Sequence, residues 1–105
     1  MHIQVITLQL TDMSDEQFHA LSEELALAFA ELSGLMSKVW LADPATNTYG
    51  GVYTWESRAA CEGFATSDLF HAVASHPNFT SVTSRYFSVI DAATRVTRGL
   101  AAARV

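Results

Sequence analysis

The sequence predicts a single α+β domain whose elements follow in the order β-α-β-β-α-β. Residues 3–10 alternate as a strand does, and the apolar residues after Ser14 recur at helical spacing. Strand-like segments at 35–42, 49–55 and 82–90 then flank a turn and a second helical region. This order is the split βαβ, or ferredoxin-like, arrangement, an antiparallel four-stranded sheet with both helices on one face.

The helix after the first strand carries its own start signal. Ser14 and Gln17 form the Ser-x-x-Gln pattern of a capping box. Asp15 and Glu16 place negative charge in the first turn, where the helix dipole favours it. We expect Gly34 to end this helix, because glycine adopts the left-handed conformation found after many helices.

The later elements are marked by turn and cap residues. The cluster at 43–47 predicts the loop of a hairpin between the second and third strands. Ser57 and Ser67 are expected to cap two successive helical segments, and Pro77 is expected to end the second. The Ala-rich end, from Ala92, predicts a short helix or a tail.

Composition favours one domain that assembles with a second copy. Of the 105 residues, 50% are apolar and only 16% are charged, below the roughly 25% charged residues of ordinary globular chains. The first strand is apolar on both sides, so the sheet face away from the helices needs a cover, and a second copy of this sheet is the simplest one. We therefore predict a homodimer of a domain at 1–91, with 92–105 as a tail or short helix for which contact with the partner subunit is one interpretation.

Charge, cysteine content and hydropathy exclude several classes of function. The net charge is −5 and no cation precedes Lys38, so a nucleic-acid partner is not expected. No apolar run is long enough to cross a membrane. The single Cys61 is typical of a reducing compartment and predicts a cytoplasmic protein. Because no metal-ligand motif or dinucleotide-binding glycine pattern occurs, we expect no metal and no nucleotide cofactor.

Large aromatic side chains on the later strands are candidate walls of a ligand pocket. Their rings would stack on a planar ligand, and their hydroxyl or N–H groups would orient it. For each of them, packing in the core or at a dimer interface is the alternative. The residues of this kind predicted to bind substrate are Trp40, Trp55, Tyr86 and, on the second helical region, Phe64. Tyr53 is a candidate catalytic residue.

Two cations and two histidines are candidates for polar chemistry. Lys38 and Arg85 lie in strands that look buried, where a cation needs a carboxylate or an anionic ligand. Stabilising an anionic intermediate would make Arg85 catalytic and Lys38 substrate-binding, although for Lys38 an ion pair with Glu56 or another acid is favoured. His71 is the predicted catalytic base, and His76, on the inward side of the same helical segment, is predicted to bind substrate.

Two short motifs resemble those of a known family. Gly34, Lys38 and Trp40 form a G-x-x-x-K-x-W pattern, and residues 50–53 form a GG-x-Y pattern. Together they are similar to the signatures of the YdhR-type monooxygenases. That family belongs, with the antibiotic-biosynthesis monooxygenases, to the dimeric α/β-barrel superfamily. The resemblance covers nearly the whole chain, residues 3–99.

The resemblance implies a homodimer with one apolar pocket per subunit between sheet and helices, and it matches His71 to the family's helix histidine. In related enzymes no flavin, haem or metal is needed. A bound electron-rich aromatic or polyketide-like molecule loses a proton, and its anion reduces molecular oxygen, the co-substrate. The sequence thus predicts a cofactor-independent monooxygenase. A non-catalytic dimer that binds a hydrophobic ligand and an oxygen-independent isomerase or cyclase are the alternatives.

Overall fold

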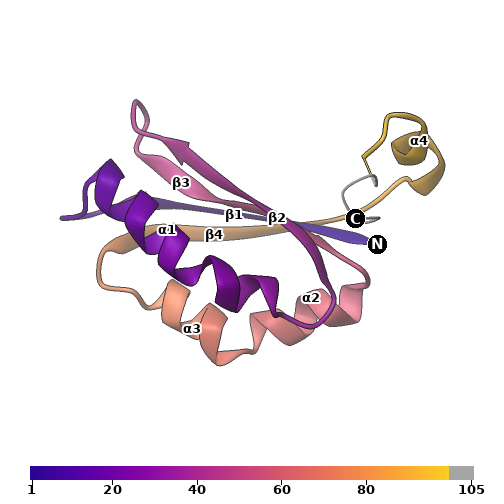
Figure 1. The fold of residues 1–105 in the computed structure, drawn as a ribbon, viewed down its shortest axis with the longest axis horizontal. Coiled ribbons are helices and arrows are strands. Elements are labelled where there is room, and N and C mark those ends of the chain that lie inside the picture. Colours follow the sequence, from indigo (N-terminus) through magenta and orange to yellow (C-terminus); the bar gives the residue numbers. More distant parts are fainter. Residues whose placement is uncertain (100–105) are drawn as a thin grey trace.

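The computed structural model describes residues 1–99 and has the predicted ferredoxin-like arrangement. One antiparallel sheet has the strand order β2-β3-β1-β4. The strands are β1 (His2–Leu10), β2 (Leu35–Asp43), β3 (Thr48–Trp55) and β4 (Phe79–Ser88). The helices are α1 (Asp15–Ala30), α2 (Arg58–Ala65), α3 (Asp68–Ala74) and α4 (Asp91–Val96). Helices α1, α2 and α3 lie on one side of the sheet, whereas α4 stands apart near the N-terminus (Figure 1).

The predicted capping box of α1 is confirmed. The Ser14 hydroxyl accepts a hydrogen bond from the backbone N–H of Gln17 at 3.1 Å, and the Gln17 side chain accepts one from the Ser14 N–H at 2.8 Å. The helix ends at Ala30, however, before the predicted stop at Gly34. Gly34 serves the turn into β2 instead, with φ of 80°, and a Cβ there would collide with Ala60 of α2.

The second helical region consists of two short helices with the predicted caps. The hydroxyl of Ser57 accepts from the N–H of Ala60, and that of Ser67 accepts from the N–H of Phe70. Helix α3 ends at Ala74, three residues before Pro77. The predicted short helix after residue 92 begins one residue earlier, as α4, and the remainder of the predicted tail, residues 100–105, lies outside the described part.

The last strand begins earlier than predicted and ends earlier. It starts at Phe79 rather than Val82, and it ends at Ser88. The pairing of β1 with β4 shifts register between Thr7 and Gln9, and Ser81 has φ of 52°. This bulge interrupts the alternation of side chains, so the sequence pattern becomes regular only beyond it.

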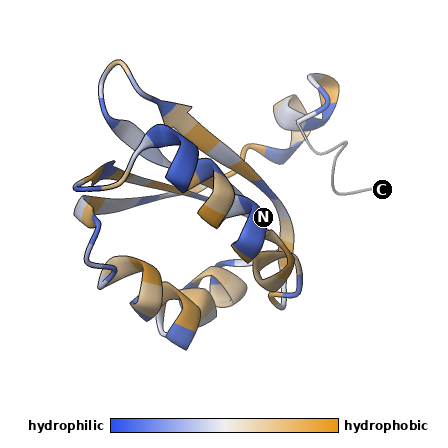
Figure 2. Ribbon diagram, turned by 60° about the vertical axis from the view of Figure 1, so that its left-hand side comes forward, coloured by the Kyte–Doolittle hydropathy of each residue, from blue (hydrophilic) through white to orange (hydrophobic). Residues whose placement is uncertain are grey.

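The register of the sheet places two rows of side chains on opposite faces. Lys38, Tyr53, Gln4 and Tyr86 are successive cross-strand partners, and they belong to the row on the face that the helices cover. The neighbouring row, on the other face, consists of Val39, Val52, Val5 and Arg85. Val39 is 58% exposed, which shows that this second face is apolar and open in the single chain. Figure 2 shows hydrophobic colour along the strands as well as on the helices.

One end of the helix-covered face is closed around Gln4, whose side chain is fully buried. Its amide N–H donates to the Ser84 hydroxyl at 3.0 Å, and its carbonyl oxygen accepts from the Trp55 indole N–H at 3.0 Å. The Cys61 thiol also donates to that oxygen, at 3.7 Å. Burial raises the pKa of this thiol, so Cys61 is a structural, protonated side chain.

Among residues 1–99, none of the helices is both long and apolar enough to span a bilayer.

Candidate functional site

An apolar cavity lies between α1 and the sheet. Its volume is about 30 Å³, enough for a water-sized molecule. Helix α1 provides one wall, β1, β2 and β3 provide the opposite wall, and α3 and β4 contribute one side chain each. The lining residues are Ile6, Leu8, Phe18, Leu21, Ser22, Leu25, Phe29, Lys38, Trp40, Gly50, Tyr53, Val73 and Phe79.

Lys38 brings the single charged group into this lining. Its Nζ lies 3.4 Å from the centroid of the Phe29 ring and 3.3 Å from that of Trp40. The Tyr53 ring centroid is 4.6 Å from the same atom. Aromatic faces attract a cation at such distances. The amine is therefore enclosed by three rings contributed by α1, β2 and β3.

No carboxylate pairs with this amine in the described part of the chain. The salt bridges among residues 1–99 join His19 to Asp15 and Arg58 to Glu62, so the expected pair of Lys38 with Glu56 does not form within this chain. Burial lowers the pKa of Lys38 from 10.5 to about 7, because the charged form loses hydration. At neutral pH this amine is thus divided between its protonated and neutral forms.

The paired glycines of β3 have a steric reason to lie beside Lys38. A Cβ on Gly51 would lie 2.8 Å from Cε of Lys38. Because glycine has no side chain, the lysine side chain has room to cross β3 at this position. Gly50 has φ of 149°, and a Cβ there would collide with the carbonyl oxygen of Ile6. The two sequence motifs, apart in the chain, thus meet at one cavity. Lys38 and Trp40 come from the first motif, and Gly50, Gly51 and Tyr53 come from the second.

A wider groove runs beside the cavity, between α1 and β2. Its volume is about 350 Å³, within the range of roughly 300–1,000 Å³ found for small-molecule sites. Phe18, Ser22 and Trp40 border both spaces. His19 and Glu23 line the groove further out. A ligand in the groove is therefore separated from Lys38 by the side chains of Phe18 and Trp40.

Two of the predicted pocket residues support the cavity from behind. Trp55 is fully buried, and its ring is stacked on that of Tyr53 with centroids 6.0 Å apart. Phe64 of α2 packs 5.4 Å from Tyr53 and 5.3 Å from Trp55. Neither residue lines the cavity itself. Burial raises the pKa of the Tyr53 hydroxyl, so it stays protonated.

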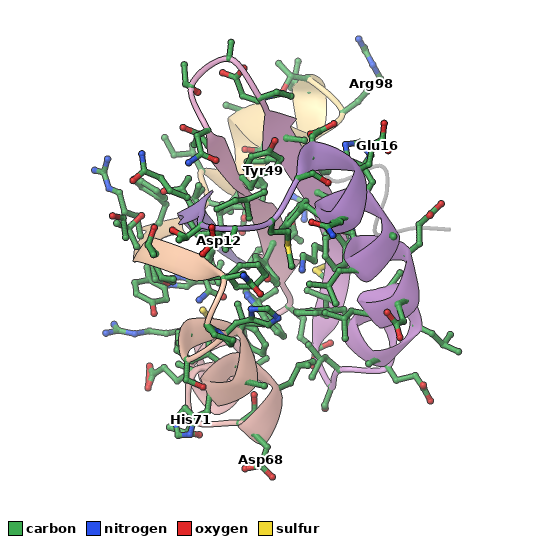
Figure 3. All side chains as sticks on the ribbon, turned by 90° about the vertical axis from the view of Figure 1, so that its left-hand side faces the viewer. Asp12, Glu16, Tyr49, Asp68, His71 and Arg98 are labelled. Carbon is green, nitrogen blue, oxygen red and sulfur yellow. The ribbon has the colours of Figure 1, made fainter. Side chains whose placement is uncertain are left out.

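The other four predicted site residues lie outside the cavity lining in this chain. His71 is exposed on α3 and lies near Asp68, well away from Tyr49 (Figure 3). His76 is half-buried, stacked on Phe79 with centroids 4.3 Å apart. Tyr86 is half-exposed beside His2. Arg85 belongs to the opposite face of the sheet, where its guanidinium lies 5.3 Å from the Phe87 ring centroid.

Sequence reasoning identified the strand side of the cavity and missed the helix side. Phe18, Leu21, Leu25 and Phe29 recur at helical spacing, which predicts an inward face of α1. Periodicity shows which side of a helix is buried. It does not show that the buried side encloses an amine, and Phe29 at 3.4 Å from Lys38 became visible only in three dimensions.

The donor set of the cavity does not fit a metal or a haem. No group of three or more His, Cys, Asp or Glu side chains that could hold a metal ion occurs among residues 1–99. The cavity lining includes no histidine or cysteine, the usual axial ligands of haem iron.

A four-stranded antiparallel sheet with its helices on one face and an aromatic cavity beneath them defines an α+β protein of the ferredoxin-like class. Residues 3–100 match the family described as "Putative mono-oxygenase ydhR", and the chain belongs to that family. No curated protein sequence matches the chain.

Solved structures of low sequence identity share the fold. One is a "putative antibiotic biosynthesis monooxygenase" from Deinococcus radiodurans, with a TM-score of 0.69 and 18% identity over 88% of this chain and 95% of that one. The haem-degrader MhuD from Mycobacterium tuberculosis has a TM-score of 0.68 and 19% identity over 86% and 96%. SnoaB, a cofactor-independent oxygenase from Streptomyces nogalater, has a TM-score of 0.64 and 18% identity over 84% and 92%.

Proposed function

We propose that this protein is a cytoplasmic, homodimeric, cofactor-independent monooxygenase that acts on an electron-rich aromatic or polyketide-like small molecule. Membership of the ydhR family supports the reaction type. The observation that carries the proposal is the Lys38 amine, held without a carboxylate among the rings of Phe29, Trp40 and Tyr53. The amine in the cavity and the adjoining groove, which is large enough for an aromatic ring, are the two parts that this chemistry requires.

In the proposed reaction, Lys38 is the base. Its neutral amine removes a proton from the hydroxyl or activated methylene of the substrate, and the ammonium that forms stabilises the resulting anion. The anion supplies the electrons that reduce molecular oxygen. For a methylene substrate, CH₂ and O₂ become C=O and H₂O, so one oxygen atom enters the product and the other leaves as water. Trp40, which borders the groove, orients the ring, and Tyr53 lines the cavity beside the Lys38 amine. We assign His71 no step because it is exposed on α3.

The homodimer is proposed from the open sheet face. Val39 is 58% exposed and Phe87 44% exposed on the side that no helix covers. Covering this face with the same face of a second copy buries both. Sedimentation at micromolar concentration tests this part, with twice the chain mass of 11.4 kDa expected. A stable monomer would contradict it.

Oxygen uptake by metal-free protein tests the reaction. The panel comprises hydroxyanthrones, quinols and polyphenols, each measured in the dark against a sample without protein that records autoxidation. We expect saturable uptake that a chelator does not inhibit and that Lys38→Met abolishes. Ligand binding without uptake would favour the non-catalytic binding protein, and chemical change of the ligand without oxygen would favour the isomerase or cyclase.

A further inference from the structure

We propose that the Lys38 cavity is an anion site, which binds its ligand as a planar aromatic monoanion whose charged oxygen pairs with Lys38 Nζ. The inference deepens the proposed function and rests on it for the identity of the site. It adds the charge and the shape of the ligand.

The first support is the incomplete environment of the amine. An ammonium group has three N–H donors, yet its close neighbours in this chain are the ring faces of Phe29, Trp40 and Tyr53. Ring faces attract a cation but supply no acceptor oxygen. Neither a side-chain hydrogen bond nor a salt bridge to the Lys38 amine forms among residues 1–99. An oxygen anion on the ligand is the group that completes this environment.

The second support is the absence of competing charge around the amine in the described part of the chain. From β3, the titratable neighbour is Tyr53, which burial keeps neutral. The cavity residues from β1, α3 and β4 are Ile6, Leu8, Val73 and Phe79, all apolar. On α1, His19 and Glu23 line the outer groove and not the cavity. In the bound state the ligand anion thus pairs with one ammonium group and meets no carboxylate within the cavity, whether the proton on Lys38 comes from the substrate or, for an already ionised ligand, from solution.

The third support is the shape of the space. The rings of Phe29 and Trp40 meet edge to face, at an interplanar angle of 81° with centroids 5.2 Å apart, and they present flat apolar walls. The cavity of about 30 Å³ is too small for an aromatic ring, whereas the groove of about 350 Å³ is large enough. Trp40 borders both spaces. The proposal therefore places the ligand ring in the groove, and it requires the Trp40 side chain to move so that the ligand oxygen reaches Lys38.

Pairing with an anion has a measurable proton linkage. The free amine has a pKa of about 7, and a bound anion raises it again towards 10.5. At pH 8 more of the free protein holds a neutral lysine than at pH 6, so a bound anion draws in more proton at pH 8. At pH 6 more of the lysine is already protonated, and the proton uptake is smaller.

Calorimetric titration with 2-naphthoate tests the proposal without any turnover. This probe stays ionised from pH 6 to 8, and titrations in buffers of different ionisation enthalpy give the protons taken up. The neutral amide of the same shape, 2-naphthamide, is the matched ligand. We expect larger proton uptake at pH 8 than at pH 6, and binding of 2-naphthoate at pH 6 about 10-fold or more tighter than that of 2-naphthamide.

Two variants complete the design. Lys38→Arg keeps a permanent charge, so it should bind 2-naphthoate with no proton uptake at either pH. Lys38→Met should bind the acid no better than the amide. Failure to bind 2-naphthoate, or equal affinity for the acid and the amide at pH 6, would overturn the anion site. If 2-naphthoate binds with proton uptake but the protein consumes no oxygen, the anion site stands and the monooxygenase proposal fails. If the protein consumes oxygen but does not bind 2-naphthoate, the monooxygenase proposal stands and the anion site fails.

Discussion

Two polar side chains occupy the same row of the sheet, under the same helices, and their surroundings differ completely. Gln4 and Lys38 are separated only by Tyr53 in this row. The amide of Gln4 has a hydrogen-bond partner at both of its ends. The amine of Lys38 has aromatic rings and a cavity.

The difference between the two environments indicates which side chain stabilises the fold and which is available to a ligand. A buried amide with all its partners makes the core specific and has nothing left to offer a ligand. A half-buried amine without an acceptor destabilises the fold when the amine is protonated. The same lack of an acceptor favours the neutral, reactive form of the amine. We infer that the Gln4 end of the sheet holds the fold together, and the proposed function places the substrate at the Lys38 end.

The largest expected effect is on turnover by Lys38→Met. Methionine keeps an unbranched chain of similar length in the cavity but cannot accept a proton, so we expect oxygen uptake to fall by about 100-fold or more. Circular dichroism should show the same fold. Turnover that survives this substitution would place the base elsewhere, with His71 or His76 the next residues to replace.

The second effect is on stability and belongs to the other end of the row. Gln4→Leu leaves the Trp55 N–H without its acceptor, so we expect a loss of about 2–3 kcal/mol in the free energy of unfolding. Denaturant titration measures it, with Ser84→Ala as a milder control that removes one hydrogen bond. Oxygen uptake per folded molecule should stay the same. An unchanged free energy of unfolding in Gln4→Leu would contradict the structural role assigned to Gln4.

A third effect makes the comparison depend on pH. The pKa of Lys38 falls from 10.5 in the unfolded chain to about 7 in the fold. Between these values the unfolded chain holds more protons, so the free energy of unfolding rises with pH in this window. Relative to Lys38→Met, the native protein should gain about 1–2 kcal/mol between pH 7 and 9, a value reduced for partial exposure. Denaturant titrations of both proteins at several pH values measure this difference. If Lys38 keeps its ordinary pKa, the difference in the free energy of unfolding will not change between pH 7 and 9.

The smallest effect concerns the path of Lys38 across β3. In Gly51→Ala the new Cβ would lie 2.8 Å from Cε of Lys38, so the lysine has to move. We expect a loss of about 1 kcal/mol, because the chain that moves is flexible. Gly63→Ala is the control, since no atom lies within 4 Å of a Cβ there, and it should stabilise α2 slightly. Equal behaviour of the two variants in 2-naphthoate binding would contradict the assigned role of Gly51.

The fold could be predicted where its signals are local. The capping pair of Ser14 and Gln17 and the caps at Ser57 and Ser67 each depend on residues within four positions of one another. The start of β4 at Phe79 could not be predicted in this way. It depends on a register shift against β1, which no single strand records.

The site was predictable in part for the same reason. Trp40, Tyr53 and Lys38 stand out by residue type and motif, and the structure brings them together. The expected ion pair of Lys38 with Glu56 does not occur within residues 1–99. The α1 side chains that pack over Lys38 decide whether its amine meets a carboxylate or a cavity. Helical periodicity predicts only that this face of α1 is apolar.

The most direct test of the account is the titration of Lys38 itself. Lys38 is the only lysine of the chain, so lysine labelled with ¹³C and ¹⁵N gives one side-chain signal whose chemical shift follows protonation. We expect a midpoint near pH 7 in the ligand-free protein and a higher one with 2-naphthoate bound. A midpoint near 10.5 without ligand would contradict the central claim, because it would mean that the amine is already paired or hydrated.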